Sequence, residues 1–569
     1  MRAPFLVWIS KPKTEQFVLF LLIAFVSLVA IIPLLRLTWA ALLPGGEFDL
    51  QRIYNLIMGR RVFEAIINTL IIAFSSTALA LLIGVVSALL VALTDMRAKS
   101  FWIFGLVIPL MIPPQVAAYA WLMAFSPSSP ILGVFGYSLQ AGTRHPFYSI
   151  GGIIFLLGLT SAPLVFLTVR ASLRSLPGDL VEAARAFGAS PLQLLFTIIL
   201  PLVRASIFAG AALAFVNSVG NFGIQAMLGI PARVSTIMTL IYRKIYSYGP
   251  SALNDMAVLS LMMAALIVVA LIFASWLGRR TDQSIVGYAR PLSLKLGAWR
   301  LPIEVLAWGF LLLTLVLPLS SLLATSFVHS LGVTLTFKTF TLEYYYKALI
   351  EIKAIRKAFL FSFSISLATV LILGVITVIM GYFVVWRRGI ISRFLQLASD
   401  LSFALPGLII GVAMILTFLR PLPIISVSIY GTFWIILIAY FSNYLALAMR
   451  PILGGFEQLD RGLDEAAQIF GAGFLTRFRD IIFPMIAPAA FAGAILVFMT
   501  AFNEIQTSVL LVSSRAQTIG PKIIGLDEAG STTVAAAVGA LMVLSVLILM
   551  IISSLFAHKL PKGVLPWSN

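Results

Sequence analysis

The sequence lacks cysteine and has few charged residues. With no cysteine among the 569 residues, disulfides and thiolate metal sites are excluded. Only 11% of the residues are charged, whereas 61% are hydrophobic and the mean hydropathy is +1.06. A soluble protein of this length would carry far more charge, so the composition predicts a membrane protein.

Histidine is also scarce, and no catalytic motif is present in the sequence. The only histidines are His145, His329 and His558, which lie in separate segments and form no metal motif. Paired catalytic carboxylates, a nucleophile elbow and a Walker A pattern are all missing. These absences argue against a membrane-embedded enzyme and against ATP hydrolysis by this chain. We expect the chain to bind no cofactor of its own.

Long uncharged runs recur along the chain. A helix needs about 20 apolar residues to cross a bilayer, and continuous runs favour helices over a β-barrel. The predicted fold is an all-α polytopic membrane protein with about 12 transmembrane helices. The first six are expected near residues 17–43, 66–93, 101–125, 151–173, 207–228 and 252–277. The second six are expected near 302–327, 359–386, 394–419, 428–449, 487–512 and 534–557.

The net charge of +18 would suggest nucleic acid in a soluble protein. Here the basic residues have a different explanation, and no nucleic-acid partner is predicted. Lys and Arg modestly favour the segments that are cytoplasmic if both termini are cytoplasmic, most clearly in the linker at 279–301. The charges would also contact lipid headgroups.

The chain contains an internal repeat. The segment Glu182–Pro201 reads EAARAFGASPLQLLFTIILP, and Glu465–Pro484 reads EAAQIFGAGFLTRFRDIIFP, with no gap between the two. The repeat divides the chain into a first half at 1–278 and a second half at 302–569. Each half has an even number of spans, so the two insert in the same orientation as a parallel repeat.

Each repeated segment, at 177–201 and 460–484, is expected to form two short helices with a sharp break. Ser175 or Asp460 would cap the first helix, Pro177 would lie at its start in the first half, and Gly188 or Gly471 would end it. Alanines and a phenylalanine share one face beside a glutamate. Such a helix could dock in a groove of another protein or lie on the inner membrane surface.

At these residues the sequence resembles the inner-membrane permeases of type I ABC importers, whose signature is EAA, three residues, Gly, nine residues and I-x-L-P. The second copy differs only in Phe483 where the signature has Leu. The resemblance implies a type I importer transmembrane fold, with one coupling helix in each half. The implied coupling residues are Glu182, Ala183, Ala184, Phe187, Gly188, Glu465, Ala466, Ala467, Phe470 and Gly471.

The same resemblance implies partners and a location. A separate ATPase dimer would carry ATP and Mg on the cytoplasmic side, and an extracytoplasmic binding protein would deliver substrate. The chain would be a multi-pass transport subunit of a bacterial inner membrane. The two fused halves and the strings NFGIQAMLG and NEIQTSVLL look like the ferric-iron permease family. Fused permeases for thiamine or phosphonates are the alternative.

Ionisable and polar residues inside spans are candidates for the substrate path, because burying them in hydrocarbon is costly. The candidates are Glu504, Asn503, Asn217, Asn221 and Asp400. Carboxylates suit a hard cation, so a transient metal contact at Glu504 stays open, as does a purely structural role.

Prolines and a glycine would break the third and ninth spans, at Pro113 and Pro114 in one half and at Pro406 and Gly407 in the other. These are hinge candidates, with a packing kink as the alternative.

A gradient-driven twelve-helix transporter is the rival class, but it predicts more coupling carboxylates and a longer central loop.

Overall fold

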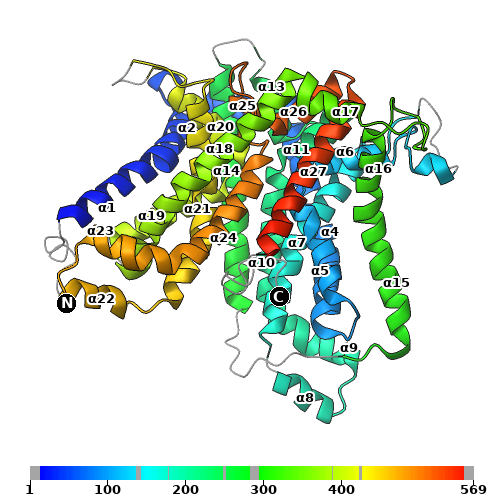
Figure 1. Cartoon of the computed structure of the whole chain (residues 1–569), viewed down its shortest axis with the longest axis horizontal. Helices are drawn as coiled ribbons and strands as arrows, with labels where there is room; N and C mark the ends of the chain where they lie inside the picture. The colour runs from blue at the N-terminus through cyan, green and yellow to red at the C-terminus, as the bar shows by residue number, and fades with distance from the viewer. Residues whose placement is uncertain are drawn as a thin grey trace.

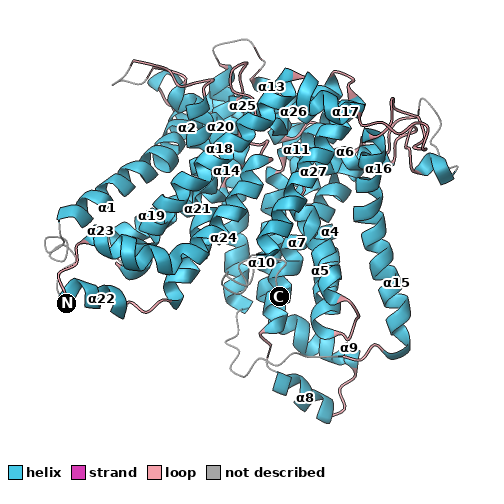
Figure 2. Cartoon of the chain, in the orientation of Figure 1, coloured by secondary structure: helices cyan, strands magenta, loops and turns pink. Residues whose placement is uncertain are grey.

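The computed structural model describes residues 13–135, 143–176, 178–245, 247, 251–281, 294–387, 389–421 and 426–555. These residues form helices joined by loops, with no strand among them (Figure 2). Most of the expected linker, Pro177 and His558 lie outside the described residues.

The predicted spans are present. Within the described residues, ten helices are long and apolar enough to cross a membrane, and three bent helix pairs pass the same test together. Each of the twelve predicted spans overlaps one of the ten helices or one of two bent pairs. The bent pair at 222–244 is an additional element that we did not expect.

The spans of the first half are α1 (Lys13–Val26) with α2 (Ile32–Leu42), α4 (Arg60–Leu93), α5 (Lys99–Met111) with α6 (Pro114–Ala124), α7 (Ile150–Arg174), α10 (Leu200–Gly220) and α14 (Ala252–Thr281). Those of the second half are α15 (Arg300–Leu311) with α16 (Leu317–Ser326), α18 (Lys353–Gly381), α19 (Ile390–Ala404) with α20 (Gly407–Phe418), α21 (Phe433–Gln458), α24 (Phe483–Phe502) and α27 (Thr532–Leu555).

Short helices lie at both ends of these bundles. On one side are α8 (Gly178–Ala186), α9 (Pro191–Gln193), α22 (Gly462–Ile469) and α23 (Phe474–Arg477). Elsewhere are α3 (Leu50–Met58), α11 (Phe222–Ile224), α12 (Ile230–Ala232), α13 (Ile237–Lys244), α17 (Glu343–Tyr346), α25 (Ser508–Leu511) and α26 (Ile519–Glu528). In Figure 1, α8 and α22 lie at the lower edge, whereas α13, α17, α25 and α26 lie at the upper edge.

Two predicted spans had wrong boundaries at both ends. The fifth and eleventh spans begin earlier than expected, because α9 and α23 run without a break into α10 and α24. They also end earlier, at Gly220 and Phe502. The apolar residues that follow are buried in protein as short helices, and hydropathy alone does not distinguish such burial from a continuing span.

The duplication extends to irregularities inside the spans. Five- or six-residue π-helical segments, η1 (Ser27–Ile31), η4 (Leu194–Ile199), η7 (Leu312–Val316) and η10 (Phe478–Ile482), each end two residues before a proline. Proline has no N–H to donate, so the carbonyl four residues earlier loses its partner and the helix widens there. The prolines occur at matching positions of both halves, and the same distortion follows.

The two halves exchange their first spans. The helix pair α1 and α2 packs on α19 and α20 of the second half, whereas α15 and α16 pack on α5 and α6 of the first half. Figure 1 shows α1 beside α19 on the left and α15 beside α5 on the right. Each bundle is therefore completed by a helix from the opposite half of the sequence.

Candidate functional site

The two EAA helices end in the same way. Gly188 and Gly471 both have φ +82°, a left-handed conformation that glycine adopts without strain. Ala189 N donates to Ala184 O and Ala472 N donates to Ala467 O, each at 3.0 Å, which completes a Schellman cap in both halves. The predicted glycine stops are confirmed.

The residues at the start of these helices differ from expectation. Ser175 is the C-cap of α7 and its hydroxyl donates to Ser172 O, so the predicted N-cap was wrong. Asp460 does accept a hydrogen bond from Gly462 N at 2.8 Å, where α22 begins. Ser190 and Pro191 open the following helix as predicted, with a capping box between Ser190 and Gln193.

The outer faces of α8 and α22 are unusually apolar for exposed helix ends. Phe187 is 93% exposed and Phe470 is 90% exposed. Glu182, Glu465, Ala183 and Ala466 are also exposed, and Ala184 and Ala467 are half-buried. The two helices thus present matching faces of aromatic, alanine and carboxylate side chains. Such faces are better suited to contact a symmetric pair of protein grooves than to remain exposed to water.

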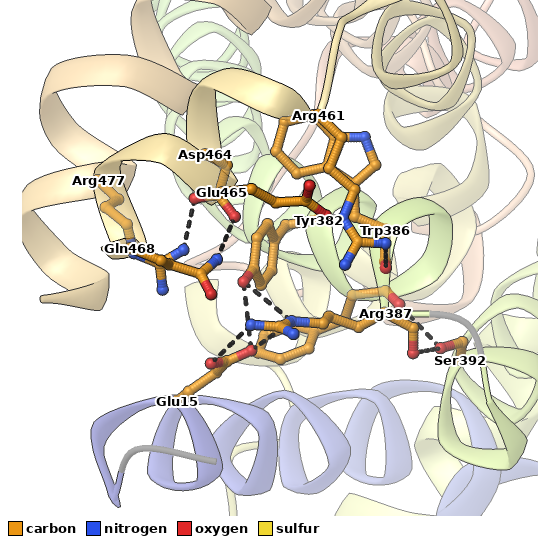
Figure 3. Close-up of polar contacts among 11 residues, drawn as sticks. Glu15, Tyr382, Trp386, Arg387, Ser392, Arg461, Asp464, Glu465, Gln468 and Arg477 are labelled. Carbon is orange, nitrogen blue, oxygen red and sulfur yellow. Dashed lines mark hydrogen bonds and ion pairs between the residues drawn. The ribbon is translucent and has the colours of Figure 1, made fainter. Parts of the chain in front are cut away.

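The second EAA loop is held to the bundle by charge. Asp464 of α22 forms a buried ion pair with Arg477 of α23, and it also accepts a hydrogen bond from Gln468 at 2.7 Å (Figure 3). A buried pair of this kind is strongly destabilised if one partner is removed, because the other charge is left uncompensated.

The first EAA loop is held without charge. In the ungapped repeat, Val181 stands at the position of Asp464 and Leu194 at the position of Arg477. Both are buried, and α8 contacts η4, which begins at Leu194. Among the described residues, no hydrogen bond or ion pair joins an α8 side chain to the body of the chain.

A second candidate site lies where the broken helices meet. The third span bends by 106° between α5 and α6, and the ninth bends by 111° between α19 and α20, at the predicted prolines. The breaks contact the ends of α10 and α24. A Cβ placed on Gly220 would lie 3.0 Å from Pro406 Cγ, and one on Gly223 would lie 2.9 Å from Gln115 N. The breaks of both halves therefore converge in one region, which we term the crossing.

Glu504 and Asn221 occupy matching positions at the crossing. Both lie just after a helix end rather than inside a span, so our placement of Glu504 and Asn221 inside spans was wrong. Asn221 Oδ1 accepts from Ile224 N at 3.1 Å and caps α11. The Glu504 carboxylate accepts from the backbone N–H groups of Thr507 and Ser508, ahead of α25. Both side chains are buried, so each serves as a helix cap in this conformation.

Asn503 and Gln115 join the two halves. Gln115 Nε2 donates to the Asn503 carbonyl at 3.3 Å, and both residues are buried. The Asn503 side-chain amide and Gln115 Oε1 have no hydrogen-bond partner among the described residues. A buried polar group without a protein partner carries a desolvation cost, so these amides call for an explanation. We did not single out Gln115 from the sequence, although a polar residue directly after Pro113 and Pro114 could have drawn attention to it.

The remaining path candidates are separate from these amides. Asn217 is half-buried and donates to Ser161 Oγ of α7 at 2.9 Å, which ties two helices together. Asp400 is exposed on α19 and is not brought to the crossing. No group of three or more acidic, histidine or cysteine side chains within the described residues could hold a metal ion.

A cavity of about 470 Å³ opens at the upper edge of the molecule. It lies between α13 of the first half and α25 and α26 of the second, and its polar lining includes Ser513, Gln517, Lys522 and Glu528. Because α25 is the helix capped by Glu504, this cavity and the crossing share one element.

Comparison with known proteins identifies the family to which the chain belongs. The profile of the binding-protein-dependent transport system inner membrane component family matches residues 80–285 and 374–562, once in each half. The chain belongs to this family. It is an importer permease with two fused transmembrane halves, and the family implies an ATPase and a substrate-binding protein as partners in general.

Three relatives illustrate the breadth of the family. An Fe(3+)-transport system permease protein of Haemophilus influenzae is 25% identical over 515 residues, which cover 89% of this chain and 92% of that protein. A molybdenum transport system permease protein of the same organism is 30% identical over 225 residues, 39% of this chain and 96% of that protein. A permease of Salmonella typhimurium named for 2-aminoethylphosphonate is 28% identical over 205 residues, 35% of this chain and 70% of that protein.

Proposed function

We propose that this permease imports ferric iron, driven by a separate ATPase dimer that binds α8 and α22. The observation that carries the ATPase assignment is the pair of matching faces in which Phe187 and Phe470 are almost fully exposed. The ferric assignment is supported by the relative that matches nearly its whole length and is named for Fe(3+) transport.

Reversing the charge of the two matching glutamates, Glu182 and Glu465, tests the docking surface. Glu182→Lys together with Glu465→Lys should abolish co-purification with the ATPase, since both helices would present the wrong charge. The matched control is Glu47→Lys with Glu351→Lys, two exposed carboxylates away from the EAA helices, one in each half. A full-strength complex with the first variant would contradict the assignment of α8 and α22 as coupling helices.

The crossing is proposed as the substrate path. ATP binding would bring the ATPase subunits together and move α8 and α22, and the two bundles would rock about the broken spans. Rocking would separate Gln115 from Asn503 and let their free amide groups contact the passing substrate. A direct metal contact at Glu504 would require its two backbone hydrogen bonds to break. On this proposal the start of α1 and the end of α27 would face the cytoplasm, because both lie toward the side that carries α8 and α22 in Figure 1.

Transport in proteoliposomes tests the substrate and the energy source together. The permease reconstituted with its ATPase and binding protein should accumulate radioactive ferric iron only with Mg-ATP. Molybdate and 2-aminoethylphosphonate should not compete. Competition by either compound would indicate that the substrate is molybdate or a phosphonate rather than ferric iron. Uptake driven by a proton gradient without ATP would indicate a secondary transporter.

A further inference from the structure

The contacts that hold α22 continue past it into the opposite half of the sequence. Arg461, at the N-terminus of α22, donates through Nη1 to Trp386 O at 3.0 Å and pairs with Glu465 at 2.9 Å. Trp386 ends η9 (Tyr382–Trp386), the final segment of the eighth span. The coupling helix is therefore attached directly to the end of that span.

The same end of the eighth span binds α1. Arg387 Nε lies 2.9 Å from Glu15 Oε1, and the Tyr382 hydroxyl donates to the same oxygen at 3.2 Å. The Glu15 side chain is fully buried. Figure 3 shows Glu15 on α1 below Tyr382 and Arg387, with the α22 residues above them. A buried carboxylate that binds an arginine and a tyrosine is a strong attachment, because breaking the ion pair would leave a charge without a partner.

In the first half, polar contacts attach α15 in a comparable way, but these contacts do not extend to α8. Asp95 pairs with Arg300, and Glu304 Oε1 accepts from Arg97 N at 2.9 Å. These contacts fix the start of α15 to the loop after the second span. Within the described residues, no side-chain hydrogen bond or ion pair continues from this loop to α8, so the two ends of the molecule are connected differently.

We propose that α22 moves α1, the first span of the opposite half of the sequence, through a chain of polar contacts, whereas α8 has no equivalent polar connection to α15. On the proposed function, which this inference presupposes, the ATPase moves α22. The bonds from Arg461 to Trp386 and from Arg387 to Glu15 pass that displacement to α1, which belongs to the first half. Glu15 and Arg387 are thus positioning residues for coupling, although neither lies on the ATPase-binding face.

A distance measurement tests this transmission without a substrate. The chain has no cysteine, so Phe17→Cys on α1 and Phe101→Cys on α5 give two unique sites for spin labels. Both phenylalanines are exposed. The separation of the labels should change when Mg-ATP is added to the permease–ATPase complex. Glu15→Gln should reduce that change by at least about twofold, because the attachment of α1 is weakened.

Matched variants complete the experiment. Glu304→Gln removes the corresponding carboxylate from the contacts that attach α15 and should leave the change intact, whereas Glu15→Arg with Arg387→Glu should restore it. Co-purified ATPase and basal ATP hydrolysis should be unaltered throughout. An unchanged response in Glu15→Gln, an equal loss in Glu304→Gln, or no nucleotide response in the parent complex would overturn the inference. Failure of the ATPase to bind the parent chain would instead overturn the proposed function.

Discussion

At position 464 the second half carries a buried aspartate, and at the matching position the first half carries Val181. The partner positions differ in the same way, with Arg477 in one half and Leu194 in the other. Evolution of a duplicated loop has thus produced two solutions to one packing problem. An ion pair and an apolar pair of similar volume can be close in stability, although breaking the ion pair is costly.

The single and double variants of this pair should therefore behave differently. Asp464→Val alone should destabilise the second EAA loop by about 3–5 kcal/mol, because Arg477 would remain buried and unpaired. Asp464→Val with Arg477→Leu copies the first half and should recover most of that loss. The measurement is the thermal unfolding temperature of the purified permease. A double variant no more stable than the single one would show that the charges have another partner.

Asp527 of α26 gives a residue-scale prediction about pH. Burial, and then the neighbouring Glu528 charge, raise the pKa of Asp527 above its usual value. The folded state thus disfavours the ionised form, so this group costs stability at neutral pH, and the cost disappears as pH falls through the raised pKa toward the ordinary value. Asp527→Asn should raise the unfolding temperature at pH 7 and have no effect near pH 4. An equal gain at both pH values would exclude ionisation as the cause.

At the scale of elements, the broken helices are what bring the halves together. Pro406 lies against Gly220, and Gln115 against Asn503, of the opposite half, and glycines also allow each break to approach the short helix that follows α10 or α24 in its own half. A Cβ on Gly407 would clash with Thr507 Oγ1 and lie 3.1 Å from Gln506 Cβ. The two proline breaks therefore position a contact surface, and their role as hinges remains a prediction.

Adding a methyl group at one of these close contacts should disturb the packing at the crossing. Gly407→Ala is expected to cost about 1–3 kcal/mol by overpacking and to lower ATP-dependent uptake. Gly374→Ala is the control, because a Cβ there meets no atom within 4 Å. Thr507→Ala added to Gly407→Ala removes the clashing oxygen and should restore part of the activity. Uptake equal to that of the parent in Gly407→Ala would show that the crossing tolerates a wider approach.

At the scale of the whole molecule, the exchange of first spans makes the halves interdependent. The pair α1 and α2 completes the second bundle, and α15 and α16 complete the first. A half expressed alone would keep only part of the surface on which its first span packs, because α2 contacts α20 as well as α14, and α16 contacts α6 as well as α27. The division of the sequence at 279–301 is therefore not a division into two independent folding units.

Split expression tests this interdependence. Residues 1–281 and 294–569 expressed together from two genes should co-purify, because both exchanged spans would find their partners. Either fragment alone should aggregate on detergent extraction. Size-exclusion chromatography distinguishes the outcomes, and a monodisperse single fragment would show that the exchanged span can pack on its own half.

The sequence by itself determined the membrane class, the approximate positions of twelve spans, the duplication and the ends of the EAA helices. These depend on local properties: the length of apolar runs, ungapped repetition, and the tendencies of proline and glycine. Gly188 and Gly471 could be predicted because a left-handed residue ends a helix wherever it occurs.

Only the tertiary structure decided which residues meet. It showed Glu504 to be a cap outside the span, left Asp400 exposed, and paired Gln115 with Asn503 across 388 positions of sequence. It also connected Glu15 to α22 through the end of the eighth span. Such contacts depend on how broken helices pack in three dimensions, and neither hydropathy nor spacing carries that information.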